Sequence, residues 1–70
     1  MPASITVRVN DDDIELSSGS TLSTVIRHLD IEPRGTAIAL NGEIAARSQW
    51  HLMHLAGGDH VEVLTVAQGG

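Results

Sequence analysis

Hydrophobic and polar residues alternate with a period of two near the N-terminus. Ile5, Val7 and Val9 are separated by single polar residues, and the alternation resumes over residues 14–16 after the polar run 10–13. A period of two is typical of strands with one buried face, and a polar run between two such segments is typical of a turn. The pattern predicts a hairpin whose turn is formed by residues 10–13.

The hydrophobic period then changes to that of a helix. The apolar positions fall at i, i+3, i+4 and i+7 and share one face, namely Leu22, Val25, Ile26 and Leu29. Ser20 or Thr21 can accept backbone N–H bonds as the N-cap, and Pro33 excludes a longer helix. One amphipathic helix is therefore expected between them.

A second hairpin is expected after the helix. Residues 36–40 have strand character, and Asn41-Gly42 strongly favours a two-residue type I′ turn because both positions of such a turn need positive φ. Ile44 is expected to anchor the short return strand. Residues 48–52 then predict a helical or 3₁₀ turn that places Trp50, the only aromatic residue of the chain, over the core.

No metal site is expected from the polar residues of the chain. His51 and His54 lie one helical turn apart, but a third ligand at a defined spacing is missing. We expect both histidines to be exposed beside a buried Leu52 and a buried Leu55. The acidic run 11–13 lacks the glycine and the closing glutamate of a calcium loop, so it is expected to be a solvated turn.

The last apolar segment is rich enough in β-branched residues to form an inner strand. Because Glu62 must face water, positions 61, 63 and 65 are expected to point toward the helix, and Leu64 and Val66 toward the open face of the sheet. By the same alternation, Ala37 and Ala39 of the strand expected over residues 36–40 lie on that face. The candidate docking patch next to the C-terminal tail consists of Ala37, Ala39, Leu64 and Val66.

The chain ends in Gly69-Gly70, a dipeptide with no side chains to pack. A domain over residues 1–66 and a flexible tail over residues 67–70 are expected. An extended tail of this length carries the terminal carboxylate about 13 Å beyond the sheet, at 3.3 to 3.6 Å per residue. The missing β-carbons let the tail enter a narrow channel of a partner protein and leave the carboxyl carbon open to a nucleophile.

The composition of the chain excludes several classes of functional site and of partner. Seventy residues allow one small domain with no room for an enclosed active site. The chain has no cysteine, which excludes disulfides, thiolate metal sites and a cysteine nucleophile. Nine acidic residues against four arginines give a net charge of −5 and no basic stripe, so neither nucleic acid nor a membrane is an expected partner. Without a signal-like or membrane-spanning apolar segment, a cytoplasmic protein is expected.

The order strand, strand, helix, strand, short strand, turn, strand resembles the ubiquitin-like β-grasp. This is an α+β fold in which one main helix packs on one face of a mixed sheet, with the last strand in the centre. More specifically, the chain closely resembles the ThiS family of sulfur carriers over nearly its whole length. The resemblance is carried by residues 39–43, 47–50 and 61–63, by Leu55 and Gly58-Asp59, and by Gly69-Gly70. Asp30-Ile31 departs from it, standing where the family often has a glycine.

The resemblance implies a protein co-substrate and not an enzyme. A ThiF-like activating enzyme would use Mg²⁺-ATP to adenylate the carboxylate of Gly70, with Gly69 as its unhindered neighbour. A persulfide sulfur would then displace AMP and leave a thiocarboxylate, from which a ThiG-like thiazole synthase would take sulfur into the thiazole ring of thiamin. The chain itself would bind no cofactor, and Leu64 and Val66 would contact either enzyme.

Three other functions remain open at this point. A MoaD-like carrier would supply sulfur to molybdopterin synthesis, although such chains tend to be longer before the tail. A ubiquitin-like modifier would be attached through Gly70 to lysines on its targets. A passive interaction domain would not need its terminal glycines at all.

Overall fold

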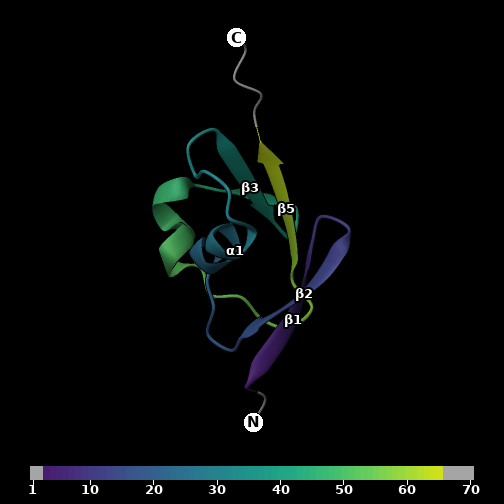
Figure 1. The fold of residues 1–70 in the computed structure, drawn as a ribbon. Coiled ribbons are helices and arrows are strands. Elements are labelled where there is room, and N and C mark those ends of the chain that lie inside the picture. Colours follow the sequence, from purple (N-terminus) through teal and green to yellow (C-terminus); the bar gives the residue numbers. More distant parts are fainter. Residues whose placement is uncertain (1–2, 66–70) are drawn as a thin grey trace.

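Five strands, one α-helix and one 3₁₀ helix follow one another along residues 3–65, which are the residues that the computed structural model describes (Figure 1). In chain order the elements are β1 (Ser4–Val9), β2 (Asp12–Ser17), α1 (Leu22–Leu29), β3 (Thr36–Leu40), β4 (Glu43–Ala45), η1 (Arg47–Leu52) and β5 (His60–Thr65).

The strands form one mixed sheet in the order β2-β1-β5-β3-β4. β5 lies in the centre, parallel to β1 and antiparallel to β3, and the two hairpins form the flanks. Both α1 and η1 lie on the same side of the sheet, and the opposite face carries no helix among the described residues (Figure 1). The expected β-grasp arrangement, with a central last strand, is confirmed.

The two hairpin turns have the same length. Asn41 and Gly42 have φ values of 51° and 89°, as a type I′ turn requires. The first turn is shorter than expected, because Asn10 takes a φ of 56° and the chain reverses within Asn10-Asp11. Asp12 is therefore already the first residue of β2 and pairs with Val9.

Helix α1 begins after Thr21, whose backbone N–H donates to Thr24 Oγ1 at 3.1 Å. The expected apolar stripe faces the sheet. Its members Leu22, Val25 and Ile26 are buried. The helix ends at Asp30, which has the left-handed conformation with φ 55° and ψ 46°. The Asp30 N–H donates to the Arg27 carbonyl at 3.1 Å, so this residue closes the last turn.

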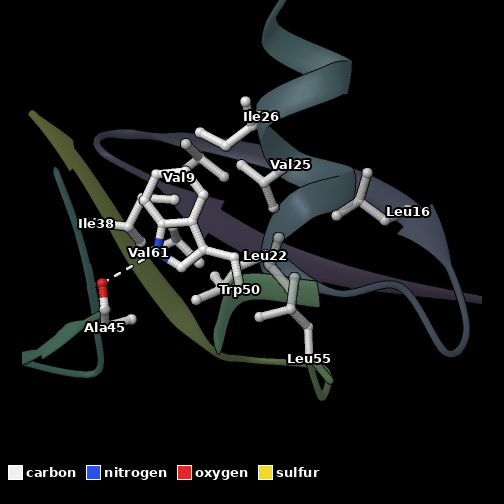
Figure 2. Packing of buried hydrophobic residues seen from close by; sticks show 11 residues of the cluster. Val9, Leu16, Leu22, Val25, Ile26, Ile38, Ala45, Trp50, Leu55 and Val61 are labelled. Atoms are coloured by element: carbon white, nitrogen blue, oxygen red, sulfur yellow. Dashed lines mark hydrogen bonds between the residues drawn. The ribbon is translucent and has the colours of Figure 1, made fainter. Parts of the chain in front are cut away.

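Trp50 packs among the buried residues of a single hydrophobic core (Figure 2). Its side chain is 3% exposed, and its Nε1–H donates to the Ala45 carbonyl at 3.0 Å. The predicted core position of Trp50 is confirmed, and the indole fills apolar volume while its polar atom is satisfied. Val63 packs against the same core as Ile26, on the side of β5 that faces the helix.

Two predicted core positions are wrong. Leu52 is 59% exposed, because side chains three residues apart overlie each other in a 3₁₀ helix, so Met53 and not Leu52 follows Trp50 toward the core. Ile44 is 73% exposed and does not anchor β4. The buried residue of that strand is its neighbour Ala45, which pairs with Ile38 on the core side.

Asp30 is the residue whose replacement should most simply stabilise this fold. Asp30→Gly removes a β-carbon from a left-handed position and a negative charge from the helix C-terminus, so we expect a gain of about 0.5–1 kcal/mol in the free energy of unfolding. Urea titration followed by Trp50 fluorescence measures it. Asp30→Asn, which removes only the charge, should give a smaller gain, and Asp30→Ala should destabilise. A loss of stability in Asp30→Gly would contradict this account of the helix end.

Candidate functional site

The end of β5 is the part of the described structure that leads toward the predicted chemical site. Thr65 pairs with Thr36 at the beginning of β3, so the strand is held by the sheet up to its last residue. Val66, Gly69 and Gly70 lie outside the described residues, and the division into a domain and a tail stays a prediction. The attachment point of the C-terminal segment is therefore a central strand and not a loop (Figure 1).

The open face of the sheet, which is the face away from α1, carries the described members of the predicted docking patch. Ala37 pairs with Leu64, and Ala39 pairs with Glu62. Residues directly opposite each other in an antiparallel pair lie on the same face, so Leu64 and both alanines share the open face with Glu62. Leu64 is 60% exposed. The binding role of these residues stays a prediction.

Ile44 belongs to the same surface and was missed from the sequence. It pairs with Ala39, on the side away from the core, and is the most exposed large apolar residue among those described. Ala39, by contrast, is only 9% exposed and forms a floor between longer side chains. The signal that could have found Ile44 is the Asn41-Gly42 turn, because a two-residue hairpin fixes the register that sets Ile44 opposite Ala39. We call Ala37, Ala39, Ile44 and Leu64 the open-face patch.

Charged and polar side chains lie beside the open-face patch on the same face. Arg8 of β1 is aligned with His60 of β5, and Glu62 lies two residues further along β5. The guanidinium Nε of Arg8 is 3.6 Å from Asp13 Oδ1, so this cation is already paired with a carboxylate. Both side chains are well exposed, so the pair contributes little to stability and mainly sets the local charge.

All four histidines of the sequence lie among the described residues and are exposed. Between residues 3 and 65 no three histidine or acidic side chains gather as metal ligands. His51 is exposed, and His54 Nδ1 lies 3.1 Å from the Gly19 carbonyl oxygen, where it links the segment after η1 to the loop before α1. Neither of the two described helices is long and apolar enough to cross a membrane. The surface features that remain are the open-face patch and its polar neighbours.

Comparison with known proteins gives concordant results at the level of sequence and of fold. Residues 3–70 match the model of the ThiS family. The sulfur carrier protein ThiS of Escherichia coli strain K12 is 31% identical over 61 residues, which span 87% of this chain and 92% of that protein.

Among solved structures, the crystal structure of the thiamine biosynthesis protein ThiS from Geobacter metallireducens superposes with a TM-score of 0.80 at 22% identity, covering 94% of this chain and all of the other. A computationally designed protein based on human erythrocytic ubiquitin matches with a TM-score of 0.57 at 16% identity, over 99% of this chain and 98% of the other. These two structures support the ubiquitin-like β-grasp fold alone. The family match over residues 3–70, together with the relative in E. coli, shows that the chain belongs to the ThiS family.

Proposed function

We propose that this chain is a sulfur carrier whose Gly70 carboxylate is adenylated, converted to a thiocarboxylate and used as the sulfur donor for the thiazole ring of thiamin. The observation that supports this most strongly is that the ThiS family match extends through residue 70 and so includes Gly69-Gly70. The E. coli relative is itself a sulfur carrier protein. In this cycle the chain is a co-substrate and its partners are the enzymes.

The chemistry takes place on the terminal carboxylate. A ThiF-like enzyme with Mg²⁺-ATP joins a carboxylate oxygen to the α-phosphorus and releases pyrophosphate, which makes AMP the leaving group. A persulfide sulfur attacks the acyl carbon, and AMP departs with the bridging oxygen. A thiol then reduces the acyl disulfide and leaves the thiocarboxylate, which a ThiG-like thiazole synthase consumes. The ATP requirement makes the cytoplasm the proposed compartment.

Two properties of the sequence suit an activated acyl end. The last two residues have no side chains, so the acyl carbon is unhindered and the tail fits a narrow channel. The chain also has neither lysine nor cysteine, and therefore no side-chain amine or thiol that would capture its own activated terminus.

The open-face patch gives the partner enzymes a place to dock beside the tail. Leu64 and Ile44 project from neighbouring parts of the face, and the small Ala37 and Ala39 leave room between them for a partner side chain. An apolar centre with a charged border is the usual composition of a transient protein interface. Val66 lies outside the described residues, and its predicted contact with the partner enzymes is part of this proposal.

Gly69 and Gly70 should be required for thiocarboxylate formation but not for the stability of the fold. Deleting Gly69-Gly70 removes no apolar side chain, so the free energy of unfolding should stay unchanged within error. Thiocarboxylate formation should be lost, because the carboxylate would end about 7 Å short of its reacting position. Mass spectrometry after incubation with the activating enzyme, Mg²⁺-ATP and a sulfur source measures this.

A variant with one alanine added after Gly70 should also form no thiocarboxylate. Near-normal product from either the deletion or the extended variant would refute the carrier function.

Leu64 should be essential for recognition and dispensable for folding. Leu64→Asp places a charge in an apolar contact, so kcat/KM for adenylation should fall more than about tenfold while the thermal midpoint hardly changes. Leu52→Asp is a matched control, because Leu52 is as exposed as Leu64 but lies in η1, away from the open face. Pyrophosphate release measures the rate. Equal rates in the two variants would eliminate the patch as the docking surface.

A further inference from the structure

One edge of β5 is left without a neighbouring strand among the described residues. β3 accompanies β5 from Val61 to Thr65, whereas β1 pairs with it only at His60 and Val61. β1 ends at Val9, and the chain reverses there into β2. The second half of the central strand is therefore paired with β3 on one side, whereas on the β1 side it has no neighbouring strand among the described residues.

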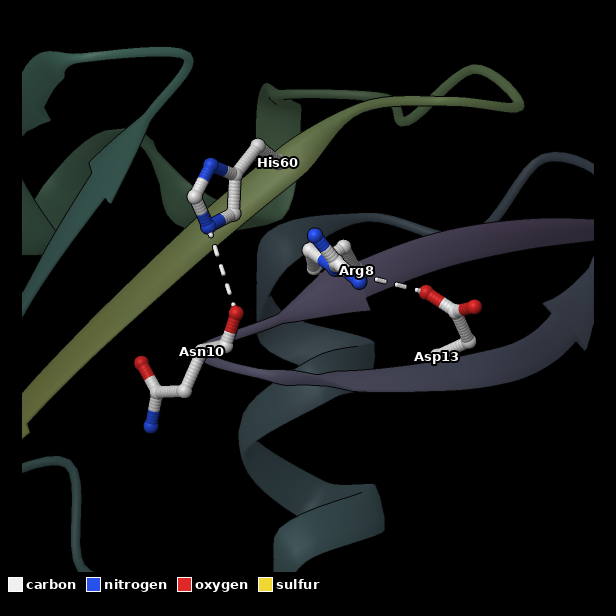
Figure 3. A network of polar contacts seen from close by, with 4 residues as sticks. All are labelled: Arg8, Asn10, Asp13 and His60. Atoms are coloured by element: carbon white, nitrogen blue, oxygen red, sulfur yellow. Dashed lines mark hydrogen bonds and ion pairs between the residues drawn. The ribbon is translucent and has the colours of Figure 1, made fainter.

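On the β1 side of β5, Asn10 takes the place of a neighbouring strand as far as Val63. Its backbone N–H donates to the Val61 carbonyl at 2.8 Å, and its side-chain Oδ1 accepts the Val63 N–H at 2.9 Å. Figure 3 shows His60 above the Asn10 carbonyl oxygen, with Nε2 at 3.3 Å. By the alternation of a strand, the next backbone groups on this edge are the Val63 carbonyl and the N–H and carbonyl of Thr65.

An open groove of about 430 Å³ lies along this edge. Its lining consists of Asn10, Asp11, His60, Glu62, Val63 and Leu64. Two of these residues are carboxylates and none is a lysine or an arginine. The nearby Arg8 already faces Asp13 at 3.6 Å. The groove thus combines two apolar residues, a free strand edge and uncompensated negative charge.

We propose that this groove receives an extended, basic segment of the adenylating enzyme, which adds a strand to β5 and places arginine or lysine side chains against Asp11 and Glu62. Backbone bonds to an exposed strand edge supply affinity in this mode of binding, and side-chain complementarity supplies specificity. A cationic partner is favoured because the groove is acidic and the whole chain carries a charge of −5, which disfavours a second copy of itself. This placement rests on the proposed function.

The charge part of the proposal is tested by steady-state adenylation kinetics. The double variant Asp11→Arg with Glu62→Arg should raise the KM for the carrier about tenfold or more with little change in kcat, because reversed charges would repel the enzyme's basic segment. Asp12→Arg with Glu43→Arg changes the net charge by the same amount at exposed positions outside the groove, and should alter KM less than about twofold. Equal KM values for the two double variants would overturn the proposal.

The strand-addition part is tested on the unaltered protein, so it does not depend on the variants folding. Hydrogen exchange at single-amide resolution should show the Thr65 amide slowed about tenfold or more in the complex with the enzyme, as expected for a new strand hydrogen bond. The Leu64 amide points toward β3 and is the internal control. Unchanged exchange at Thr65 in the saturated complex would overturn the proposal. Failure of the wild-type chain to be adenylated would instead overturn the proposed function.

Discussion

Two asparagine side chains, one from each hairpin turn, hold the central strand β5 in register. Asn41 Oδ1 accepts the His60 N–H at 2.9 Å from the β3 side, and Asn10 Oδ1 accepts the Val63 N–H at 2.9 Å from the β1 side. Both asparagines have positive φ, which Asn adopts more readily than most residues. A slip of one residue would turn every side chain of β5 to the other face, so these two contacts act together with the β3–β5 pairing to preserve the core and the open-face patch.

This register divides β5 into a face that packs against the core and an exposed face. Val61 is fully buried and Val63 packs against the core, whereas Glu62 and Leu64 face outward. In so small a domain the central strand contributes to the core from one of its faces while the other face stays exposed. Trp50 packs in the same core, and β5 stays paired with β3 up to Thr65, the last described residue before the C-terminal segment.

Local sequence patterns predicted the structure correctly in segments where the hydrophobic residues follow a single period. The stripe of α1, the turn at Asn41-Gly42 and the outward position of Leu64 all followed from spacing and from one charged neighbour. Leu52 was misplaced because a 3₁₀ period was not distinguished from an α-helical one, and Ile44 because an apolar strand residue was assumed to be buried. The groove depends on where β1 ends beside β5, a contact between distant segments that no local pattern encodes.

The central claim is that Gly70 is a carboxylate that becomes a thiocarboxylate. The most direct test is the intact mass of the wild-type chain before and after incubation with its adenylating enzyme, Mg²⁺-ATP and a persulfide donor, followed by fragmentation to locate the change. We expect a gain equal to the exchange of one oxygen for one sulfur, confined to Gly70 and absent without ATP. An unchanged mass in the presence of active enzyme, or a modification located anywhere else in the chain, would contradict it.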